Sequence, residues 1–227
     1  MKRLVVLTGA GMSAESGIHT FRDANGLWEE YDVMEVASIV GWRKNPELML
    51  LFYNERRKQM FGCQPNRGHL LLAELEKSFE IQIITQNIDD LHERAGSTNI
   101  LHLHGELTKA RSTADPSMIY TIGDNEIKPG DKCAKGSQLR PHIVWFGEEV
   151  PLIETARNIV ESADILCIIG TSLSVQPAAG LFHFAPYDSP VYLIDPNPPE
   201  YLPGKVKVIA KGAGEGVAEF IEMIQSR

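Results

Sequence analysis

Short apolar runs recur along the chain, and most of them end in small or polar residues. Val, Ile and Leu dominate these runs, which is typical of parallel strands that are buried on both faces. Stretches with helical spacing or strong helix formers separate the runs and predict helices. The strands are expected at 4–7, 79–85, 100–107, 164–169, 191–194 and 205–209, and the helices at 46–60, 65–77, 152–162 and 216–226.

Strands that alternate with helices predict an α/β fold with a doubly wound parallel, Rossmann-like sheet. The Rossmann-like part of the domain, with its sheet and the helices around it, is expected to comprise about residues 1–30, 78–107 and 141–227. Residues 31–77 are interpreted as a helical segment. Residues 108–140 are polar, rich in Lys, Asp and Gly, and carry no sustained period. We therefore interpret 108–140 as a small inserted module within one domain that spans 1–227.

The composition fits one globular domain, since 43% of the 227 residues are hydrophobic and 23% are charged. A formal charge of -8 argues against a protein that binds nucleic acid by neutralising phosphates. No apolar run is long enough for a signal peptide or a membrane span, and the three widely spaced cysteines imply no disulfide framework. We expect a cytoplasmic monomer that binds neither nucleic acid nor membranes.

Small and polar residues gather where four of the predicted strands end. The carboxyl ends of parallel strands open on one crevice, so these clusters are expected to surround one ligand. The first cluster precedes a helix start and suits a phosphate, although an ordinary turn between a strand and a helix often holds two glycines as well. The clusters are Gly9-Ala10-Gly11, Gln86-Asn87-Ile88-Asp89, Gly170-Thr171-Ser172, and Asp195 with Asn197.

Further motifs follow in a fixed order along the chain. They are Ser13-Ala14-Glu15-Ser16-Gly17-Ile18 with Thr20-Phe21-Arg22, then His104-Gly105, and then Phe146-Gly147-Glu148. Together with the strand-end clusters they resemble the sirtuins, the NAD-dependent protein-lysine deacylases, from Leu4 to the last helix. The resemblance implies that NAD is consumed as a co-substrate and that the partner is an acylated-lysine protein or peptide. The products would be nicotinamide and O-acyl-ADP-ribose.

The resemblance implies NAD contacts along the whole crevice. Arg22 would pair with a phosphate, and Phe21 would shield the reacting sugar carbon from water. Ala14 stands where a hydride-transfer fingerprint has its third glycine, so the turn is expected to hold NAD for cleavage at its nicotinamide bond. The expected cofactor-binding residues are Gly9, Ala10, Gly11, Ser13, Ala14, Thr20, Phe21, Arg22, Trp28, Gln86, Asn87, Ile88, Asp89, Gly170, Thr171, Ser172, Asp195, Asn197 and Ala213.

Two residues are assigned to catalysis by the resemblance, His104 and Asn87. Asn87 and Asp89 would hydrogen-bond the nicotinamide carboxamide, although Asp89-Asp90 also suits the cap of a following helix. His104 would be the base that takes a proton from a ribose hydroxyl, a task suited to an imidazole with an ordinary pKa of about 6.5. We interpret His102, two residues earlier, as a structural histidine.

An acyl-lysine peptide is expected to bind as an added strand, through main-chain hydrogen bonds that tolerate many sequences. The resemblance implies that the peptide lies between residues 144–148 and a loop at 173–175. The residues assigned to the peptide are Val144, Phe146, Gly147, Glu148 and Val175.

Tyr53 and Arg56 stand three positions apart, on one face of a predicted helix. The pair resembles the Tyr-x-x-Arg of class III sirtuins, which remove succinyl and malonyl groups. The sequence as a whole resembles the bacterial members of the family. A phenol and a guanidinium together suit the distal carboxylate of a succinyl-lysine. Arg57 and Lys58, which follow, are interpreted as a solvated basic helix end. We expect removal of succinyl and malonyl groups, alongside some removal of acetyl groups.

The chain departs from the sirtuin pattern at two places. The family usually holds a structural zinc with four cysteines in the small module, but here that module contains only Cys133, and Ser112 replaces one ligand. One thiolate does not make a tetrahedral site, so no bound zinc is predicted. Asp195 stands where many relatives have Asn against the adenosine part of NAD, and its carboxylate can still accept a hydrogen bond from a ribose hydroxyl.

Two other functions share the same activated sugar carbon. One is ADP-ribosyl transfer to protein, and the other is a catalytically silent sensor of NAD or ADP-ribose. His104 argues against a silent sensor, because such a relative would need no base. The pair Tyr53 and Arg56 argues against transfer, which would not need a carboxylate receptor.

Overall fold

A six-stranded sheet forms the centre of the molecule. The computed structural model describes residues 1–18, 31–200, 202 and 205–225, and the backbone of 27–28. The strands pair in parallel in the order β11-β10-β9-β1-β4-β5, so the predicted α/β fold with a parallel sheet is confirmed. The strands are β1 (Arg3–Thr8), β4 (Glu80–Thr85), β5 (Ile100–His102), β9 (Ile165–Ile169), β10 (Val191–Ile194) and β11 (Val206–Ile209).

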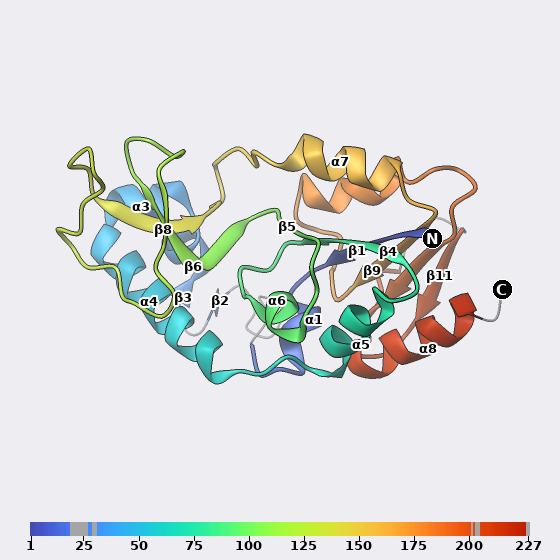
Figure 1. Cartoon of the computed structure of the whole chain (residues 1–227). Helices are drawn as coiled ribbons and strands as arrows, with labels where there is room; N and C mark the ends of the chain where they lie inside the picture. Colours follow the sequence, from blue (N-terminus) through green and yellow to red (C-terminus); the bar gives the residue numbers. More distant parts are fainter. Residues whose placement is uncertain (19–26, 29–30, 201, 203–204, 226–227) are drawn as a thin grey trace.

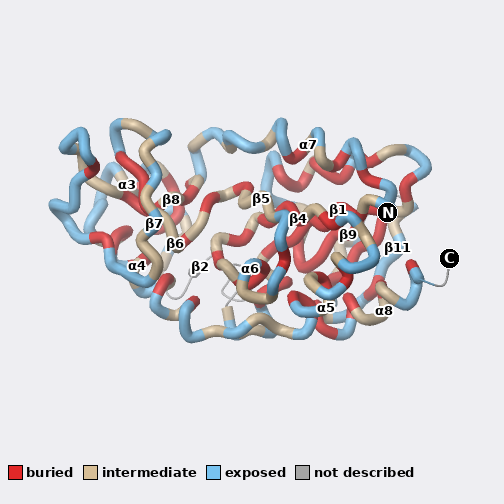
Figure 2. Tube along the Cα trace, in the orientation of Figure 1, coloured by how far each residue is buried: buried red, intermediate tan, exposed pale blue. Residues whose placement is uncertain are grey.

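Helices cover both faces of this sheet (Figure 1). α5 (Arg67–Leu75) and α8 (Ala213–Gln225) pack on one face, and α7 (Ile153–Glu161) with the 3₁₀ helix η1 (Ala178–Phe184) packs on the other. Within β1, Leu4 and Val6 belong to the first core, whereas Val5 and Leu7 belong to the second. This alternation is the period of two that a strand imposes, and buried residues line both sides of the sheet (Figure 2). The sheet is doubly wound.

The small module is a second, antiparallel sheet. It consists of β6 (Gly105–Ser112), β7 (Ile119–Thr121) and β8 (Leu139–Ile143), in the order β7-β6-β8. The predicted strand 100–107 is therefore wrong as one strand, because β5 belongs to the parallel sheet and β6 to the module. Gly105 begins β6 with φ +84°, and a Cβ there would overlap the carbonyl oxygen of His142. A residue with a side chain would not permit this break.

Residues 31–77 are helical apart from short connections. α4 (Pro46–Gly62) lies against the module, where its Phe52 packs with Leu107 and Ile143. Asn45 caps α4 by accepting a hydrogen bond from the Leu48 N–H at 3.1 Å. The shorter elements are β2 (Leu27–Trp28), β3 (Tyr31–Asp32), α1 (Gly11–Ala14), α2 (Val33–Val36), α3 (Ile39–Lys44) and α6 (Leu91–Ala95). The sequence indicated a helix start after residues 9–11, helices within 31–77 and a helix after Asp90, but it did not predict the short strands β2 and β3.

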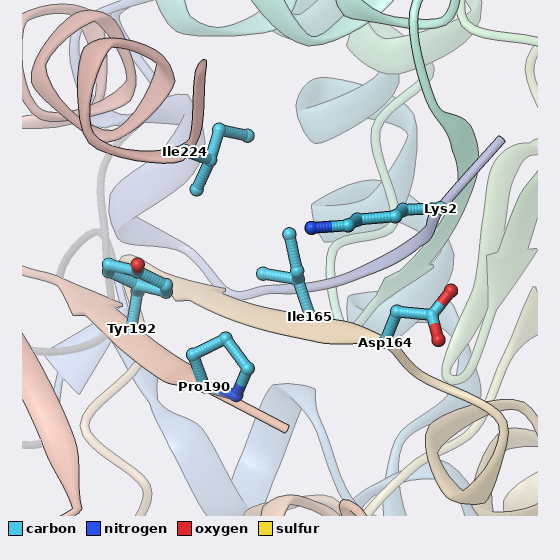
Figure 3. A pocket seen from close by; sticks show the side chains of 6 residues that line it. All are labelled: Lys2, Asp164, Ile165, Pro190, Tyr192 and Ile224. Carbon is cyan, nitrogen blue, oxygen red and sulfur yellow. The ribbon is translucent and has the colours of Figure 1, made fainter. Parts of the chain in front are cut away.

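A cavity of about 280 Å³ opens at the amino ends of three strands (Figure 3). Its lining includes Lys2, Asp164 and Pro190, which directly precede β1, β9 and β10. Tyr192 and Ile224 also line it. The polar clusters lie at the carboxyl ends of these strands. The cavity therefore lies on the opposite edge of the sheet from the candidate site.

In the described part of the chain, no helix has the length and apolar character needed to cross a membrane.

Candidate functional site

The strand order changes direction at β1: β4 and β5 are added on one side of it, and β9, β10 and β11 on the other. β4 neighbours β1 on one side and β9 neighbours it on the other, which makes this a topological switch point. Two of the predicted clusters, at residues 9–11 and 170–172, follow these two strands. They are brought together as expected from the sheet.

Glycines at this point allow two turns to touch. The Gly11 N–H donates to the Gly170 carbonyl at 2.8 Å, and the Gly9 N–H donates to the Ile169 carbonyl at 3.0 Å. A Cβ on Gly11 would approach the Gly170 Cα to 2.7 Å, and Gly170 has φ +62°. The glycines are therefore required by the packing of the turns, in addition to any approach of a ligand.

Ser13 joins the first turn to the residues after β4. Its hydroxyl donates to the Asp89 Oδ2 at 2.9 Å and accepts from the Asn87 Nδ2 at 3.1 Å. All three side chains are buried. Asp89 also accepts a hydrogen bond from the Leu91 N–H at 3.2 Å. It therefore both supports the start of α6 and belongs to the polar cluster. Burial raises the pKa of the Asp89 carboxyl, although the hydrogen bonds from Leu91 and Ser13 oppose this shift.

His104 lies in the turn between β5 and β6. Its Nδ1 is 3.1 Å from the carbonyl oxygen of Gln86, and a carbonyl can only accept, so Nδ1 carries the hydrogen. In the neutral ring, Nε2 is then the basic nitrogen. Burial lowers the pKa of His104, and the Gln86 carbonyl only partly opposes this. A neutral imidazole with an available Nε2 lone pair has the properties of a general base.

The loop after β9 is the third part of the site. Thr171 is buried and its hydroxyl lies 3.4 Å from the Gln86 Nε2, which connects the loop to the end of β4. Leu173 has φ +54°, an uncommon conformation for a residue with a side chain. Val175 follows with 37% of its side chain exposed. Ser172 is partly exposed next to Thr171, while Ala10 and Ile88 are partly exposed at the edges of their clusters.

The remaining cofactor residues are more dispersed. Asp195 is buried, and its Oδ1 accepts a hydrogen bond from the Asn197 N–H at 2.9 Å, so it stabilises its own turn. Asn197 is exposed, and Ala213 is buried at the start of α8. Ala14 is exposed at the end of α1. The predictions for Thr20, Phe21, Arg22 and the side chain of Trp28 fall outside the described residues.

The segment that was expected to receive the peptide is bonded to its neighbours along one side. The Val144 N–H donates to the His104 carbonyl at 2.9 Å, and the Phe146 N–H donates to the Ala37 carbonyl at 2.8 Å. Phe146 exposes 42% of its side chain, and Gly147 is exposed beside it with φ +87°.

Glu148 differs from the rest of this segment, because its carboxylate faces into the protein. It accepts two hydrogen bonds from Arg140, at 2.7 and 2.9 Å, and two from Arg111 at 3.2 Å. The Trp145 N–H also donates to it at 2.9 Å. The carboxylate therefore fastens the segment to β6 and β8. The peptide contact of Glu148, which was expected through the main chain, stays a prediction.

Tyr53 and Arg56 have different surroundings on α4. Tyr53 is buried, and its oxygen accepts a hydrogen bond from the Trp145 Nε1 at 2.8 Å. Arg56 is partly exposed and lines a cavity of about 30 Å³ together with Ile88 and Asp89. α4 therefore carries Tyr53 against the segment 144–148 and Arg56 toward the Ser13, Asn87 and Asp89 cluster.

The interpretation of Arg57 as a solvated helix end is wrong, whereas Lys58 is exposed as expected. Arg57 is 1% exposed, and it donates to the Leu107 carbonyl at 2.6 Å and to the Asn54 Oδ1 at 2.8 Å. Its charge joins α4 to the module. The run of basic residues did not reveal which of them faces inward, because the helix position of each depends on how α4 packs.

Sequence reasoning missed three residues that hold the site in place: Arg140, Trp145 and Glu93. Arg140 stacks on the Trp145 ring, with 3.4 Å between its Cζ and the ring centroid. Glu93 in α6 pairs with His102, whose Nε2 lies 2.7 Å from its Oε1. An Arg and a Trp five positions apart, next to Glu148, were a weak signal that the sequence did contain.

The module does not offer a matching set of zinc ligands. Cys133 lies within hydrogen-bonding reach of Ser112 and Ser137, so the residue that replaces a ligand does lie beside the single cysteine. Hydroxyls are poor zinc ligands beside one thiolate. Across the ranges that the structure describes, no group of three His, Cys, Asp or Glu residues is arranged to hold a metal ion. These donors do not fit a structural zinc.

Comparisons with known proteins agree on one family. The sequence model of the Sir2 family matches residues 9–177. The chain belongs to the sirtuin (Sir2) family. An NAD-dependent protein deacylase from Bacteroides thetaiotaomicron is 58% identical, over 99% of this chain and 98% of its own length. One from Helicobacter pylori strain 26695 is 56% identical over 97% of this chain and 96% of its own length.

Solved structures extend the likeness to the whole sirtuin fold. A Sir2 homologue in complex with NAD is 41% identical, covering 99% of this chain and 90% of its own, with a TM-score of 0.88. A Sir2–p53 peptide–NAD⁺ complex is 29% identical, covering 99% and 94% of the two chains, with a TM-score of 0.80. This sirtuin is an NAD-dependent protein deacylase.

The residues of this chain fit NAD. The touching glycine turns bring main chain close to main chain at the switch point, and the buried Ser13, Asn87 and Asp89 offer a hydroxyl, an amide and a carboxylate at one place. Such groups suit a phosphate approached by main chain and a carboxamide that both donates and accepts.

Proposed function

We propose that this sirtuin removes succinyl and malonyl groups, as well as acetyl groups, from lysine side chains, as class III sirtuins do. One observation carries the proposal: α4 turns the Tyr53 phenol toward Trp145 and the Arg56 guanidinium toward Asp89 and Ile88. The two groups are one helical turn apart. A carboxylate at the end of an acyl chain between them would meet one neutral and one charged donor.

The Tyr53 phenol is prepared to act as a donor. The indole Nε1 of Trp145 can only donate a hydrogen, so the phenol oxygen accepts in this pair and the phenol hydrogen takes no part in it. Burial raises the pKa of Tyr53, with the Trp145 hydrogen bond opposing it, and the phenol therefore keeps its hydrogen at neutral pH. A protonated phenol suits a carboxylate better than the methyl of an acetyl group.

Arg56 supplies a positive charge at the other side of the acyl chain. It lies near Phe52, with 5.7 Å between its Cζ and the ring centroid, and it lines the small cavity with Asp89. A guanidinium in a partly dry cavity strengthens a hydrogen bond to a carboxylate, which is worth about 1.5–3 kcal/mol net. Arg57 does not compete, because the Leu107 carbonyl and Asn54 hold it on another face.

The chemistry is divided among the residues around the crevice. NAD supplies the ribose carbon that accepts the acyl oxygen when nicotinamide leaves. Ser13, Asn87 and Asp89 would orient the carboxamide, and the Nε2 of His104 would take a proton from a ribose hydroxyl. The exposed Phe146 and Val175 would border the acyl-lysine peptide, whose main chain would bond to the segment 144–148.

The test compares kcat/KM on acetyl-lysine and succinyl-lysine versions of one peptide. Arg56→Met is expected to lower the succinyl value about 10- to 100-fold, the loss of one charge-assisted hydrogen bond, and to change the acetyl value much less. Lys58→Met, an exposed cation on the same helix, is the matched control. Equal losses on the two peptides, or an unchanged succinyl value, would contradict the acyl assignment.

Mass spectrometry of the same reactions separates deacylation from ADP-ribosyl transfer. Deacylation predicts nicotinamide and O-acyl-ADP-ribose, whereas a peptide that carries ADP-ribose would indicate transfer. A silent sensor would give neither product. The cytoplasmic location and the monomeric state stay predictions, and light scattering of the purified protein tests the second.

A further inference from the structure

Two histidines, two positions apart, hold two consecutive carbonyl groups of the site. The pairing of β4 with β5 ends at Thr85 and His102. The carbonyl groups of Gln86 and Asn87, which follow β4, therefore need donors from outside this pairing. His104 Nδ1 lies 3.1 Å from the Gln86 carbonyl oxygen, and His102 Nδ1 lies 3.3 Å from the Asn87 carbonyl oxygen. Between them, the Leu103 N–H donates to the Thr85 carbonyl at 2.8 Å.

The second ring nitrogen distinguishes the two histidines. His102 Nε2 is 2.7 Å from the Glu93 Oε1, whereas His104 has no carboxylate partner among the described residues. A carbonyl and a carboxylate both only accept, so both nitrogens of His102 must carry a hydrogen to complete these bonds. A ring with two N–H groups is an imidazolium.

We propose that His102 works as a buried imidazolium that positions Asn87, and that Glu93 keeps it charged. The Asn87 main chain is held from one side by His102, while its side-chain amide is held by Ser13. The position of the amide therefore depends on the ring. His102 is a positioning residue, since it reaches the nicotinamide only through Asn87. The inference rests on the proposed role of Asn87 and is independent of which acyl group is removed.

The charges around His102 agree with this state. The ring is 8% exposed and the Glu93 side chain 41% exposed. Burial lowers the pKa of His102, but the hydrogen bond and charge of Glu93, the charge of Glu106 and the Asn87 carbonyl together raise it above the ordinary value. Asp89 and the neighbouring His92 also act on it, and His92 is kept neutral by its own burial. The pKa of Glu93 is lowered, which matches the same pair.

The two histidines should therefore limit the reaction at opposite ends of the pH range. His104 has a lowered pKa and must be neutral to act as a base, so it sets an acid limb. His102 must be charged, so kcat should fall as the pH rises through its raised pKa. Above that pKa, the Nε2 lone pair would face the Glu93 carboxylate and push the ring away from Asn87.

The first experiment measures protonation directly. Nitrogen-15 and proton NMR of the ring of His102 in the apo protein, with His102→Gln to assign the signals, should report two N–H groups at pH 6 and a pKa above that of a free histidine. Glu93→Gln should lower this pKa, because an amide can donate to a neutral Nε2. A neutral His102 at pH 6 would overturn the proposal whatever the enzyme's activity.

The second experiment compares pH profiles of kcat for nicotinamide release. Glu93→Gln should move the alkaline limb to lower pH or abolish it, and leave the acid limb and the KM for the peptide in place. His102→Gln should lower kcat about 10- to 100-fold, the effect of one charge-assisted hydrogen bond, and remove the alkaline limb. Glu161→Gln on the exposed side of α7 is the matched control.

Failure of the two proposals can be told apart. An alkaline limb that persists in a folded His102→Gln protein, checked by circular dichroism, would overturn the positioning role. If His102 titrates with the expected raised pKa but Arg56→Met leaves the ratio of succinyl to acetyl turnover unchanged, only the acyl assignment is rejected.

Discussion

The two sides of the candidate site are held by different forces. At the carboxyl edge of the parallel sheet, glycine turns and hydrogen bonds between neighbouring strand ends do the positioning, as between Ser13 and Asn87. At the module, charged side chains hold the segment 144–148 in place, because Glu148 accepts hydrogen bonds from both Arg140 and Arg111. The sheet edge is fixed by strand geometry, whereas the module depends on a few strong contacts between segments that the strands do not align.

This difference bears on the absence of zinc ligands. A zinc site would tie the strands of the module together, and here Cys133 stands without other thiolates. The Arg140 and Glu148 pair ties β8 to the segment 144–148, and the ring of Trp145 covers the guanidinium from one side. The ion pair and the stack therefore do structural work at the junction of module and sheet.

The largest expected effect falls on the sheet edge. His104→Gln removes the basic Nε2 and should lower kcat by about 10²- to 10⁴-fold, while the protein keeps its fold. In the wild type, the acid limb of kcat/KM should lie below the ordinary pKa of a histidine, about 6.5, because burial lowers the His104 pKa. Steady-state rates from pH 5 to 9 measure both. An acid limb above the ordinary pKa would contradict the neutral base.

The next largest effect falls on the module. Arg140→Met leaves the Glu148 carboxylate largely buried with one fewer cation and should reduce the free energy of unfolding by about 3 kcal/mol. Urea unfolding followed by tryptophan fluorescence measures this. Arg157→Met, in an exposed pair with Glu161, is the control and should cost no more than about 1 kcal/mol.

The same ion pair predicts a pH effect on stability. The contacts with Arg140 and Trp145 outweigh burial, so the pKa of Glu148 is lowered in the folded state. Its contribution is therefore complete above the unfolded pKa of a glutamate, about 4.3, and is lost as the pH falls through the folded pKa. Melting temperatures between pH 7 and pH 3 should fall more in the wild type than in Glu148→Gln. Parallel curves would contradict this.

A smaller effect links the two regions. Trp145→Phe keeps a ring under Arg140 but removes the hydrogen bond to the Tyr53 oxygen. We expect a loss of about 1 kcal/mol in stability and a lower ratio of succinyl to acetyl turnover. Both peptides are measured on one preparation. Trp42→Phe is the control, because Trp42 is a second tryptophan that packs beside Trp145. An unchanged ratio would show that the phenol does not need the indole.

The smallest expected effect is that of a chelator. Incubation with EDTA should leave activity and melting temperature unchanged, because the module's donors do not fit a structural zinc. Metal analysis of protein purified without chelators checks the premise. One zinc per chain, or a loss of stability with EDTA, would reverse the prediction.

The sequence by itself determined the parallel sheet and the meeting of its strand ends. Runs such as 165–169 are apolar at every position, which is typical of a strand buried on both faces, and the polar residues that follow such strands converge because parallel strands end at one edge of the sheet. It did not determine the split between β5 and β6, because the alternation of 100–107 continues through the turn at His104. Only Gly105, in its positive φ, reports that break.

The tertiary structure decided which charged residues face inward. Arg57 and Arg56 are neighbours of one type, yet Arg57 is buried against Leu107 while Arg56 lines a cavity. The motif that contains Glu148 did not predict that the packing of β6 and β8 brings its carboxylate to Arg111 and Arg140. A sequence pattern fixes the period of an element, but a buried charge is stable only where distant segments bring its partners, and those partners are set by the whole fold.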